Sequence, residues 1–235
     1  GHILGSHPAI NGYYELHLDY TEPAALDRQL AAYLAHDALK PGSRYLFDKL
    51  LHDDYALCPA ALGTVEIKVL IALLAPEHAL KSIVALFARK DAAHPYATPA
   101  GAADYYCRRL ATLAAFAREN PRRYHYYDAE FFQHAPERLL ARLAAWLELA
   151  PPLREHYHTF SQSGQERKGD TSPRLLSGRL ERTPRDYAHI TLPQALLANA
   201  RTAYHACREE LVGHAAEALC VKSELPPKFR LPRIT

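Results

Sequence analysis

The residues with the clearest chemical potential form a short polar run at positions 166–173, ERKGDTSP. An arginine guanidinium offers a fork of hydrogen-bond donors to phosphate oxygens, and a lysine ammonium adds a compact positive charge. Gly169 allows the backbone to approach a ligand closely, because glycine has no side chain. The run lacks apolar periodicity and lies between helical patterns. It therefore predicts an exposed loop in which Arg167 and Lys168 clamp an anion, with an ordinary solvated loop as the alternative.

The elements that position such a loop follow from hydrophobic periodicity. Helical patterns and strand patterns alternate along the chain. Helices are expected at residues 23–38, 56–62, 77–87, 99–118, 136–149 and 193–219, and strands at 13–18, 43–47, 65–74 and 123–128. This alternation predicts an α/β domain with a mainly parallel central sheet flanked by helices.

Ligands of parallel sheets bind beyond the carboxyl ends of the strands. Lys49 and Asp128 each lie just past an expected strand, and residues 74–82 follow another. Glu15 and His17 are two positions apart in the strand expected at 13–18, so we expect them on the same side of it. The alternative for these residues is an ordinary exposed strand or a solvated loop.

Composition limits the classes of partner. The chain has 235 residues, 49% of them hydrophobic and 23% charged, which is ordinary for a globular protein. We expect one domain over residues 1–225 and an extended tail over 226–235, which holds three prolines. The formal net charge of +2 creates no global field that attracts nucleic acid, so we expect no nucleic-acid partner. The 14 histidines lack the spacing of a zinc site, so we expect no metal.

The cysteines and the apolar runs bear on location. Cys58, Cys107, Cys207 and Cys220 are far apart and form no C-x-x-C pair, so we expect buried thiols in a reducing, cytoplasmic compartment. The sequence holds no run of about 18 apolar residues, so no membrane span is expected.

Four segments in order resemble the sulfotransferase family that uses 3′-phosphoadenylyl sulfate (PAPS) as donor, most closely its bacterial branch. The resemblance covers roughly residues 1 to 185. The segments are residues 4–8 (LGSHP) followed by Glu15; Asp48-Lys49; residues 74–76 (LAP) with Ser82, then residues 105–106 (YY) and 109–110 (RL); and residues 167–169 (RKG) with 170–172 (DTS) and 177–178 (SG).

The resemblance implies a three-layer domain of the P-loop type, with PAPS as the donor, adenosine 3′,5′-bisphosphate (PAP) as the product and no metal. It implies that Glu15 lies beside the acceptor, where it is the first candidate for the base that takes the acceptor proton, with His17 as the second. It places Lys49 near the transferring sulfonate. The 3′-phosphate of the donor is then held by four residues: Ser82, Arg167, Lys168 and Gly169.

The chain departs from the family pattern in two places. The glycine-rich phosphate loop of the family should lie just before Gly1. We therefore expect about 10–20 further N-terminal residues in the natural protein, forming a strand and a phosphate-binding turn. Leu74 stands where the family has an arginine that pairs with the 3′-phosphate.

Two other functions stay open. A degenerate member of the family would bind a nucleotide without transferring anything, and Leu74 favours this alternative. A P-loop small-molecule kinase would need Mg²⁺ ligands at strand ends. The acceptor of a sulfotransferase could be a small molecule such as a phenol, a carbohydrate, a lipid or a peptide tyrosine. The sequence does not determine the oligomeric state.

Overall fold

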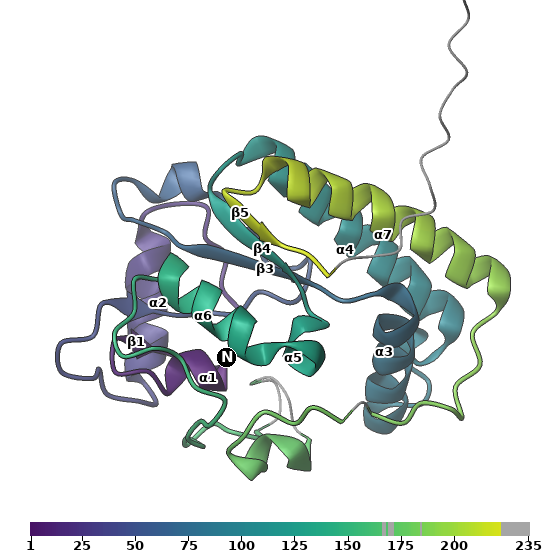
Figure 1. Ribbon diagram of the computed structural model, residues 1–235, viewed down its shortest axis with the longest axis horizontal. Helices are drawn as coiled ribbons and strands as arrows, with labels where there is room; N and C mark the ends of the chain where they lie inside the picture. Colours follow the sequence, from purple (N-terminus) through teal and green to yellow (C-terminus); the bar gives the residue numbers. More distant parts are fainter. Residues whose placement is uncertain (166–167, 169–171, 184, 222–235) are drawn as a thin grey trace, which may run out of the picture.

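A computed structural model of the chain describes residues 1–165, 168, 172–183 and 185–221. Within these residues, parallel strands form two small sheets, and helices pack around them (Figure 1). The first sheet pairs β1 (Ile10–Asn11) with β2 (Tyr45–Leu46). The second has the order β3-β4-β5, formed by Val69–Leu73, Tyr124–Asp128 and Glu217–Leu219. The expected α/β class with parallel pairing is confirmed at this level, and the tail at 226–235 lies outside the described residues.

The helices connect and cover these strands. Their bounds are α1 (His2–Gly5), α2 (Ala24–Leu34), α3 (Pro76–Lys90), α4 (Pro99–Glu119), α5 (Phe131–His134), α6 (Pro136–Trp146) and α7 (Gln194–His214). Prolines at 76, 99 and 136 occupy the first turns of α3, α4 and α6, where the missing backbone N–H costs least. Short 3₁₀ turns are formed at Pro59–Leu62, Pro95–Ala97 and Pro173–Ser177.

Alternate residues of β4 face two different helical layers. Tyr124 and Tyr126 belong to the apolar cluster that includes α3, α4 and α7. Tyr127 belongs to a second cluster with α5 and α6, and this cluster also holds Ile10 of β1. Helices therefore cover both faces of the β3-β4-β5 sheet (Figure 1), and α6 ties the two sheets into one core.

Residues 13–18 do not form the strand expected from their alternation. The strand lies earlier, at Ile10–Asn11. Gly12 (φ +85°) and His17 (φ +59°) have left-handed backbone conformations, which interrupt an extended chain. The expectation that Glu15 and His17 repeat along one side of a strand is therefore wrong.

The C-terminal helical pattern also ends earlier than expected. Helix α7 stops at His214, because Ala215 is extended, and Glu217–Leu219 forms the third strand of the larger sheet. The N–H of Ala216 donates to the carbonyl of Tyr124 at 2.9 Å, which starts this pairing. The Glu-Ala-Leu run continues a helical pattern as well as it begins a strand, so the sequence alone does not separate the two.

Burial departs from the hydrophobic pattern in α2, and the expectation that all four thiols are buried is wrong in part. In α2 the apolar Leu30 and Leu34 are exposed, whereas Ala25, Gln29 and Tyr33 are buried. Gln29 reaches the core because its side-chain amide donates to the carbonyl of Leu46 at 3.1 Å. All four cysteines carry free thiols; Cys207 is buried, Cys58 is exposed, and Cys107 and Cys220 are half-buried.

Candidate functional site

The structure brings Glu15 and Lys49 into direct contact. The Lys49 Nζ lies 3.2 Å from the Glu15 Oε1. Glu15 is almost fully buried, with 6% of its surface exposed, whereas 30% of the Lys49 side chain is exposed. The pair follows β1 and β2, whose parallel pairing brings their carboxyl ends to the same edge. A buried carboxylate thus meets a solvent-accessible cation at the sheet edge where ligands bind in such folds.

Asp48 fixes the relative position of the two residues. Its Oδ1 accepts from the backbone N–H of Leu16 at 2.9 Å and of Lys49 at 2.6 Å, and its Oδ2 accepts from the Tyr20 hydroxyl at 2.6 Å. Burial raises the pKa of Asp48, and these hydrogen bonds partly offset that rise. Asp48 therefore ties the segment that carries Glu15 to the turn that carries Lys49.

Two glycines allow the elements beneath the pair to pack closely. A Cβ on Gly12, which has a positive φ, would lie 2.2 Å from the carbonyl oxygen of Phe47. A Cβ on Gly5 in α1 would lie 2.6 Å from the carbonyl oxygen of Gly12. Both distances are shorter than a side chain tolerates. Larger residues here would push α1, the turn after β1 and the turn after β2 apart.

Lys40 adds a second support that sequence reasoning missed. Its Nζ donates to the carbonyls of His7 at 3.0 Å, of Ile10 at 2.6 Å, and of Gly5. Burial lowers the pKa of Lys40. The lysine satisfies carbonyls at and after the end of α1, a usual role for a cation near a helix C-terminus. In the sequence it only marks the end of a helical pattern, so its partners could not be inferred.

One residue of the basic run, Lys168, lies against the segment that carries Glu15. The Lys168 Nζ lies 4.9 Å from the centroid of the Tyr14 ring, and Tyr14 directly precedes Glu15. Arg167 and Gly169, the other expected members of the anion clamp, lie outside the described residues. Lys168 thus lies over the ring of the residue that precedes the candidate base.

Aromatic packing holds residues 160–162, which precede the basic run in sequence, in place. The ring of Phe160 stacks on Tyr13 with 4.3 Å between centroids, and the backbone N–H of Gln162 donates to the Tyr13 hydroxyl at 3.0 Å. The Tyr13 hydroxyl in turn donates to Asp37 at 3.2 Å. Residues 160–162 are therefore fixed against the same segment that carries Glu15.

Two buried polar atoms in this region have hydrogen-bonding capacity to spare. Across the described part of the chain, the Tyr14 hydroxyl has no hydrogen-bond partner, and the Glu15 Oε1 has its 3.2 Å ion pair with Lys49 but no further hydrogen bond. Burial raises the pKa of the Tyr14 hydroxyl above its ordinary value, so it remains a proton donor. Native structures rarely leave buried polar atoms unpaired, and such atoms are often completed by a ligand or a water molecule.

The two other described candidates are His17 and Ser82. The half-buried His17 ring packs 5.5 Å from the ring of Tyr55. Ser82 lies in α3, where its hydroxyl accepts from the Tyr187 hydroxyl at 3.3 Å. His17 also lies close enough to Asp48 for its charge to lower the pKa of that carboxyl, whereas the recorded partner of Ser82 is Tyr187.

The end of β3 carries a negative charge that the sequence did not reveal. The N–H of Ala75, at the start of α3, donates to the Glu130 Oε1 at 2.8 Å. Glu130 follows β4 and reaches this position because β3 and β4 are paired. The N-terminus of a helix carries a partial positive charge that attracts anions. Here the Glu130 carboxylate takes the place that a phosphate could otherwise occupy. With Leu74 as its neighbour, this segment is poorly suited to hold the 3′-phosphate.

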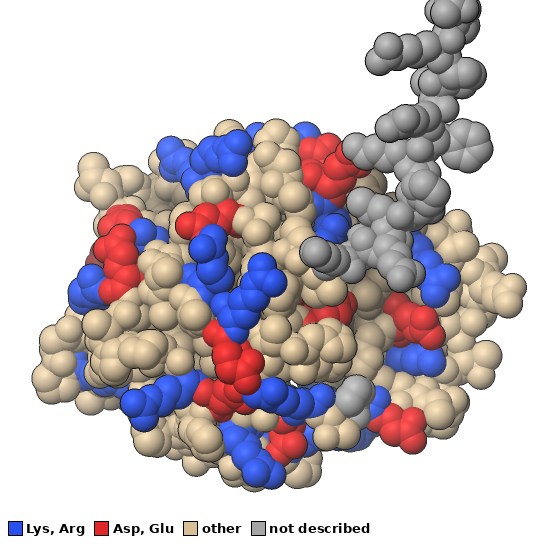
Figure 2. Space-filling view, in the orientation of Figure 1, with Lys and Arg blue, Asp and Glu red and all other residues tan. Residues whose placement is uncertain are grey.

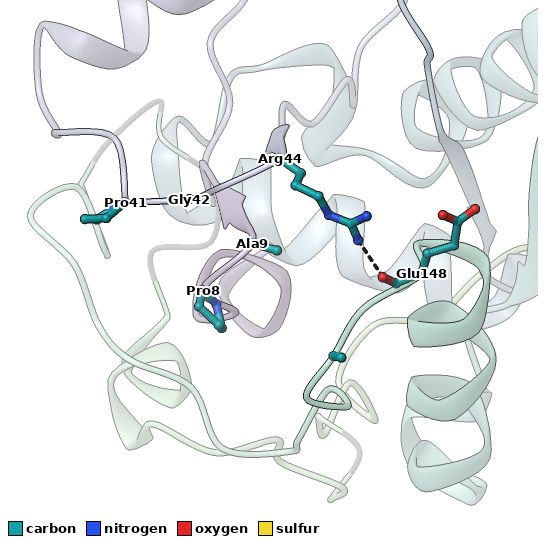
Figure 3. A pocket seen from close by; sticks show the side chains of 7 residues that line it. Pro8, Ala9, Pro41, Gly42, Arg44 and Glu148 are labelled. Atoms are coloured by element: carbon teal, nitrogen blue, oxygen red, sulfur yellow. Dashed lines mark hydrogen bonds between the residues drawn. The ribbon is translucent and has the colours of Figure 1, made fainter.

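Two hollows lie at the opposite ends of the strands. One of about 400 Å³ is lined by Pro8, Ala9, Pro41, Gly42, Arg44, Glu148 and Ala150 (Figure 3). Ala9 precedes β1 and Arg44 precedes β2, and the Arg44 guanidinium donates to the carbonyl of Glu148. A second, of about 310 Å³, lies between Lys68, Arg122 and Trp146 near the amino ends of β3 and β4. Neither hollow includes Glu15 or Lys49.

Surface charge and possible metal-binding groups give little further information about the function. Figure 2 shows Lys and Arg interspersed with Asp and Glu on the visible face, which agrees with the net charge of +2. The described residues contain no group of three or more His, Cys, Asp or Glu side chains that could hold a metal ion. None of the helices they form combines the length and the apolar character needed to cross a membrane.

Comparison with known proteins assigns no family. None of the family models, curated proteins or solved structures compared with the chain matches it. The function proposed below therefore depends on the site geometry and on the resemblance of short sequence segments.

Proposed function

We propose that the protein is a sulfotransferase that moves a sulfuryl group from PAPS to a hydroxyl or amine acceptor. The observation that carries the proposal is the 3.2 Å contact between Glu15 and Lys49 at the carboxyl ends of β1 and β2. Lys168, over the ring of Tyr14, supplies a positive charge on the segment that carries Glu15. A base, a cation for the leaving group and a cation for a donor phosphate are the groups that sulfuryl transfer needs.

The chemistry assigns one role to each side chain. Glu15 takes the proton of the acceptor hydroxyl as the acceptor oxygen bonds to sulfur. The bond between sulfur and the bridging oxygen of the phosphosulfate breaks, and PAP leaves with the negative charge on that oxygen. Lys49 stabilises this charge as it develops. The contact between the two residues keeps the cation close to the reacting groups before the substrates bind.

A non-catalytic nucleotide-binding protein is the second candidate. Leu74 removes an arginine expected from the family resemblance, and the Glu130 carboxylate occupies the start of α3. Both features weaken the donor site at the end of β3. This candidate and the sulfotransferase share nucleotide binding and differ in turnover.

Thermal denaturation with PAP, AMP, and ATP with Mg²⁺ tests the donor class. A ligand that binds only the native state raises its stability by about 2.7 kcal/mol at a concentration one hundred times Kd. We expect PAP to raise Tm more than AMP, which lacks the 3′-phosphate. A Tm rise with ATP and Mg²⁺ alone would favour a kinase instead.

Lys168→Ala sharpens this test. It should weaken PAP binding by about 1.5–3 kcal/mol, the value of a charged hydrogen bond, and leave AMP binding nearly unchanged. Lys90→Ala, at the exposed end of α3, is the matched control. Calorimetry that shows equal losses for PAP and AMP would remove the 3′-phosphate assignment of Lys168.

Turnover separates the enzyme from the non-catalytic candidate. Transfer of labelled sulfate from PAPS would be followed against panels of phenols, carbohydrates, lipids and amines. We expect a sulfated product and PAP in equal amounts. PAP binding without any product would favour the nucleotide-binding protein.

A further inference from the structure

Helix α4 holds the chain immediately after Lys49. The Arg109 guanidinium donates through Nη2 to the carbonyl of Leu50 at 3.1 Å and through Nη1 to Asp53 Oδ1 at 3.0 Å. One turn earlier on α4, the Tyr105 hydroxyl donates to the carbonyl of Leu51 at 3.2 Å. Arg109 Nη1 also donates to the carbonyl of His52 at 3.4 Å, so two side chains of one helix hold four consecutive residues, 50–53, in a clamp.

The clamp is better shielded than an ordinary surface ion pair. The side chains of Arg109 and Asp53 are 20% and 25% exposed, and the guanidinium fork reaches backbone and carboxylate acceptors together. Burial raises the pKa of Tyr105 to about 12, although the charge of Arg109 opposes that rise. Tyr105 therefore keeps its proton near neutral pH and remains a donor to the loop.

Lys49 lies between two anchors. On its N-terminal side, Asp48 accepts from the Lys49 N–H and ties it to the Glu15 segment. On its C-terminal side, Arg109 holds the carbonyl of Leu50. A lysine side chain is long and flexible, so its ammonium stays in one place only if the backbone beneath it is fixed.

We propose that Arg109 is a positioning residue that sets the location of the Lys49 ammonium through the loop at 50–53. The effect on transfer rests on the proposed function, whereas the effect on Lys49 itself does not. The helix that carries Arg109 is packed against α3 and α7, so it provides a rigid base for the loop.

Kinetics of Arg109→Met test the proposal. Misplacing a catalytic group by about 1 Å costs up to about 100-fold in rate, so we expect kcat to fall roughly 10- to 100-fold with PAP affinity unchanged. Arg108→Met is the matched control, since Arg108 is next on the helix and bonds to Asp104 and Tyr96 instead. It should keep the wild-type rate.

A double-mutant cycle shows whether Arg109 acts through Lys49. If it does, Arg109→Met should slow the Lys49→Ala variant no further, since the group it positions has been removed. Losses that multiply in the double variant would overturn the proposal. Arg109→Lys is a milder variant that controls for misfolding of Arg109→Met. It keeps the charge but lacks the fork needed to reach Leu50 and Asp53 together, so it should lose part of the rate.

A second readout is independent of turnover. Labelling of Lys49 with an amine-reactive reagent, followed by peptide mass spectrometry, reports the surroundings of its ammonium. We expect Arg109→Met to change the labelling rate and Arg108→Met to leave it unchanged. A changed rate in a protein that transfers no sulfate would support the clamp and refute the proposed function. A wild-type labelling rate in Arg109→Met would overturn the clamp.

Discussion

The ion pairs Asp128–Arg208 and Glu15–Lys49 both lie near the ends of strands, but their surroundings differ. Asp128 ends β4 and forms a bidentate pair with Arg208 of α7, with distances of 2.9 and 2.7 Å. Its oxygens also accept from the Tyr126 hydroxyl at 2.5 Å and the Val221 N–H at 2.8 Å. Only 3% of the Asp128 side chain and 16% of the Arg208 side chain are exposed.

The Glu15–Lys49 pair has fewer partners. It consists of one 3.2 Å contact, and the Glu15 Oε1 makes no hydrogen bond to the described residues. The carboxylate is nearly as buried as Asp128, whereas its cation is more open to solvent than Arg208. A buried charge with full hydrogen bonding stabilises the fold, whereas one with spare capacity is available to a ligand. The comparison therefore assigns a structural role to Asp128–Arg208 and a functional one to Glu15–Lys49.

The largest effect on stability is expected from Asp128→Ala. It leaves Arg208 partly buried without its counter-ion and should cost about 3–5 kcal/mol of unfolding free energy, measured by urea denaturation. Asp104→Ala, which breaks an exposed pair with Arg108, is the control and should remain close to wild type. If both variants lose equally little unfolding free energy, the Asp128–Arg208 pair does not stabilise the fold, and the contrast with the Glu15–Lys49 pair fails.

A smaller effect is expected at His125, which tests whether missing hydrogen bonds alone mark a functional residue. His125 is fully buried, and neither ring nitrogen has a hydrogen-bond partner in the described part of the chain. The centroid of its ring lies 5.8 Å from that of Trp146. His125→Phe should stabilise the protein by about 1–3 kcal/mol at pH 7 and leave any transfer activity unchanged.

The same substitution has a pH signature. Burial lowers the pKa of His125, so as the pH falls below about 6.5 the unfolded chain takes up the proton before the folded one. The wild type therefore loses stability over that range, and His125→Phe should lose less. Thermal denaturation from pH 8 to pH 5 measures the difference. Parallel curves, or a lower Tm for the variant at every pH, would show that the imidazole is well satisfied in the fold.

The sequence predicts the elements better than the contacts between them. Prolines at helix starts and the aromatic run of β4 are local features, and the structure confirms the elements they predict. Glu15 and Lys49 were found through a family resemblance, and the fold brings them together. The partners of Lys40, Asp48 and Arg109 depend on elements distant in sequence. Nothing in the residues near them specifies which carbonyl or N–H they meet.

One misplaced element has a local cause and the other a tertiary one. Residues 13–18 alternate, but the left-handed turn at His17 breaks the extended chain. Glu217–Leu219 is too short to show a strand period, and it becomes a strand only because β4 is available for pairing. Tertiary contacts decide short apolar runs of this kind.

Glu15→Gln tests the central claim most directly, because it preserves shape and removes the base. With PAPS and an acceptor identified by screening, the transfer rate should fall by about 10²–10⁴. PAP affinity and Tm should stay near wild type, since Lys49 remains partly solvated. His17→Asn, measured in parallel, should keep most of the rate. Transfer at the wild-type rate by Glu15→Gln would contradict the account, and a loss confined to His17→Asn would move the base to His17.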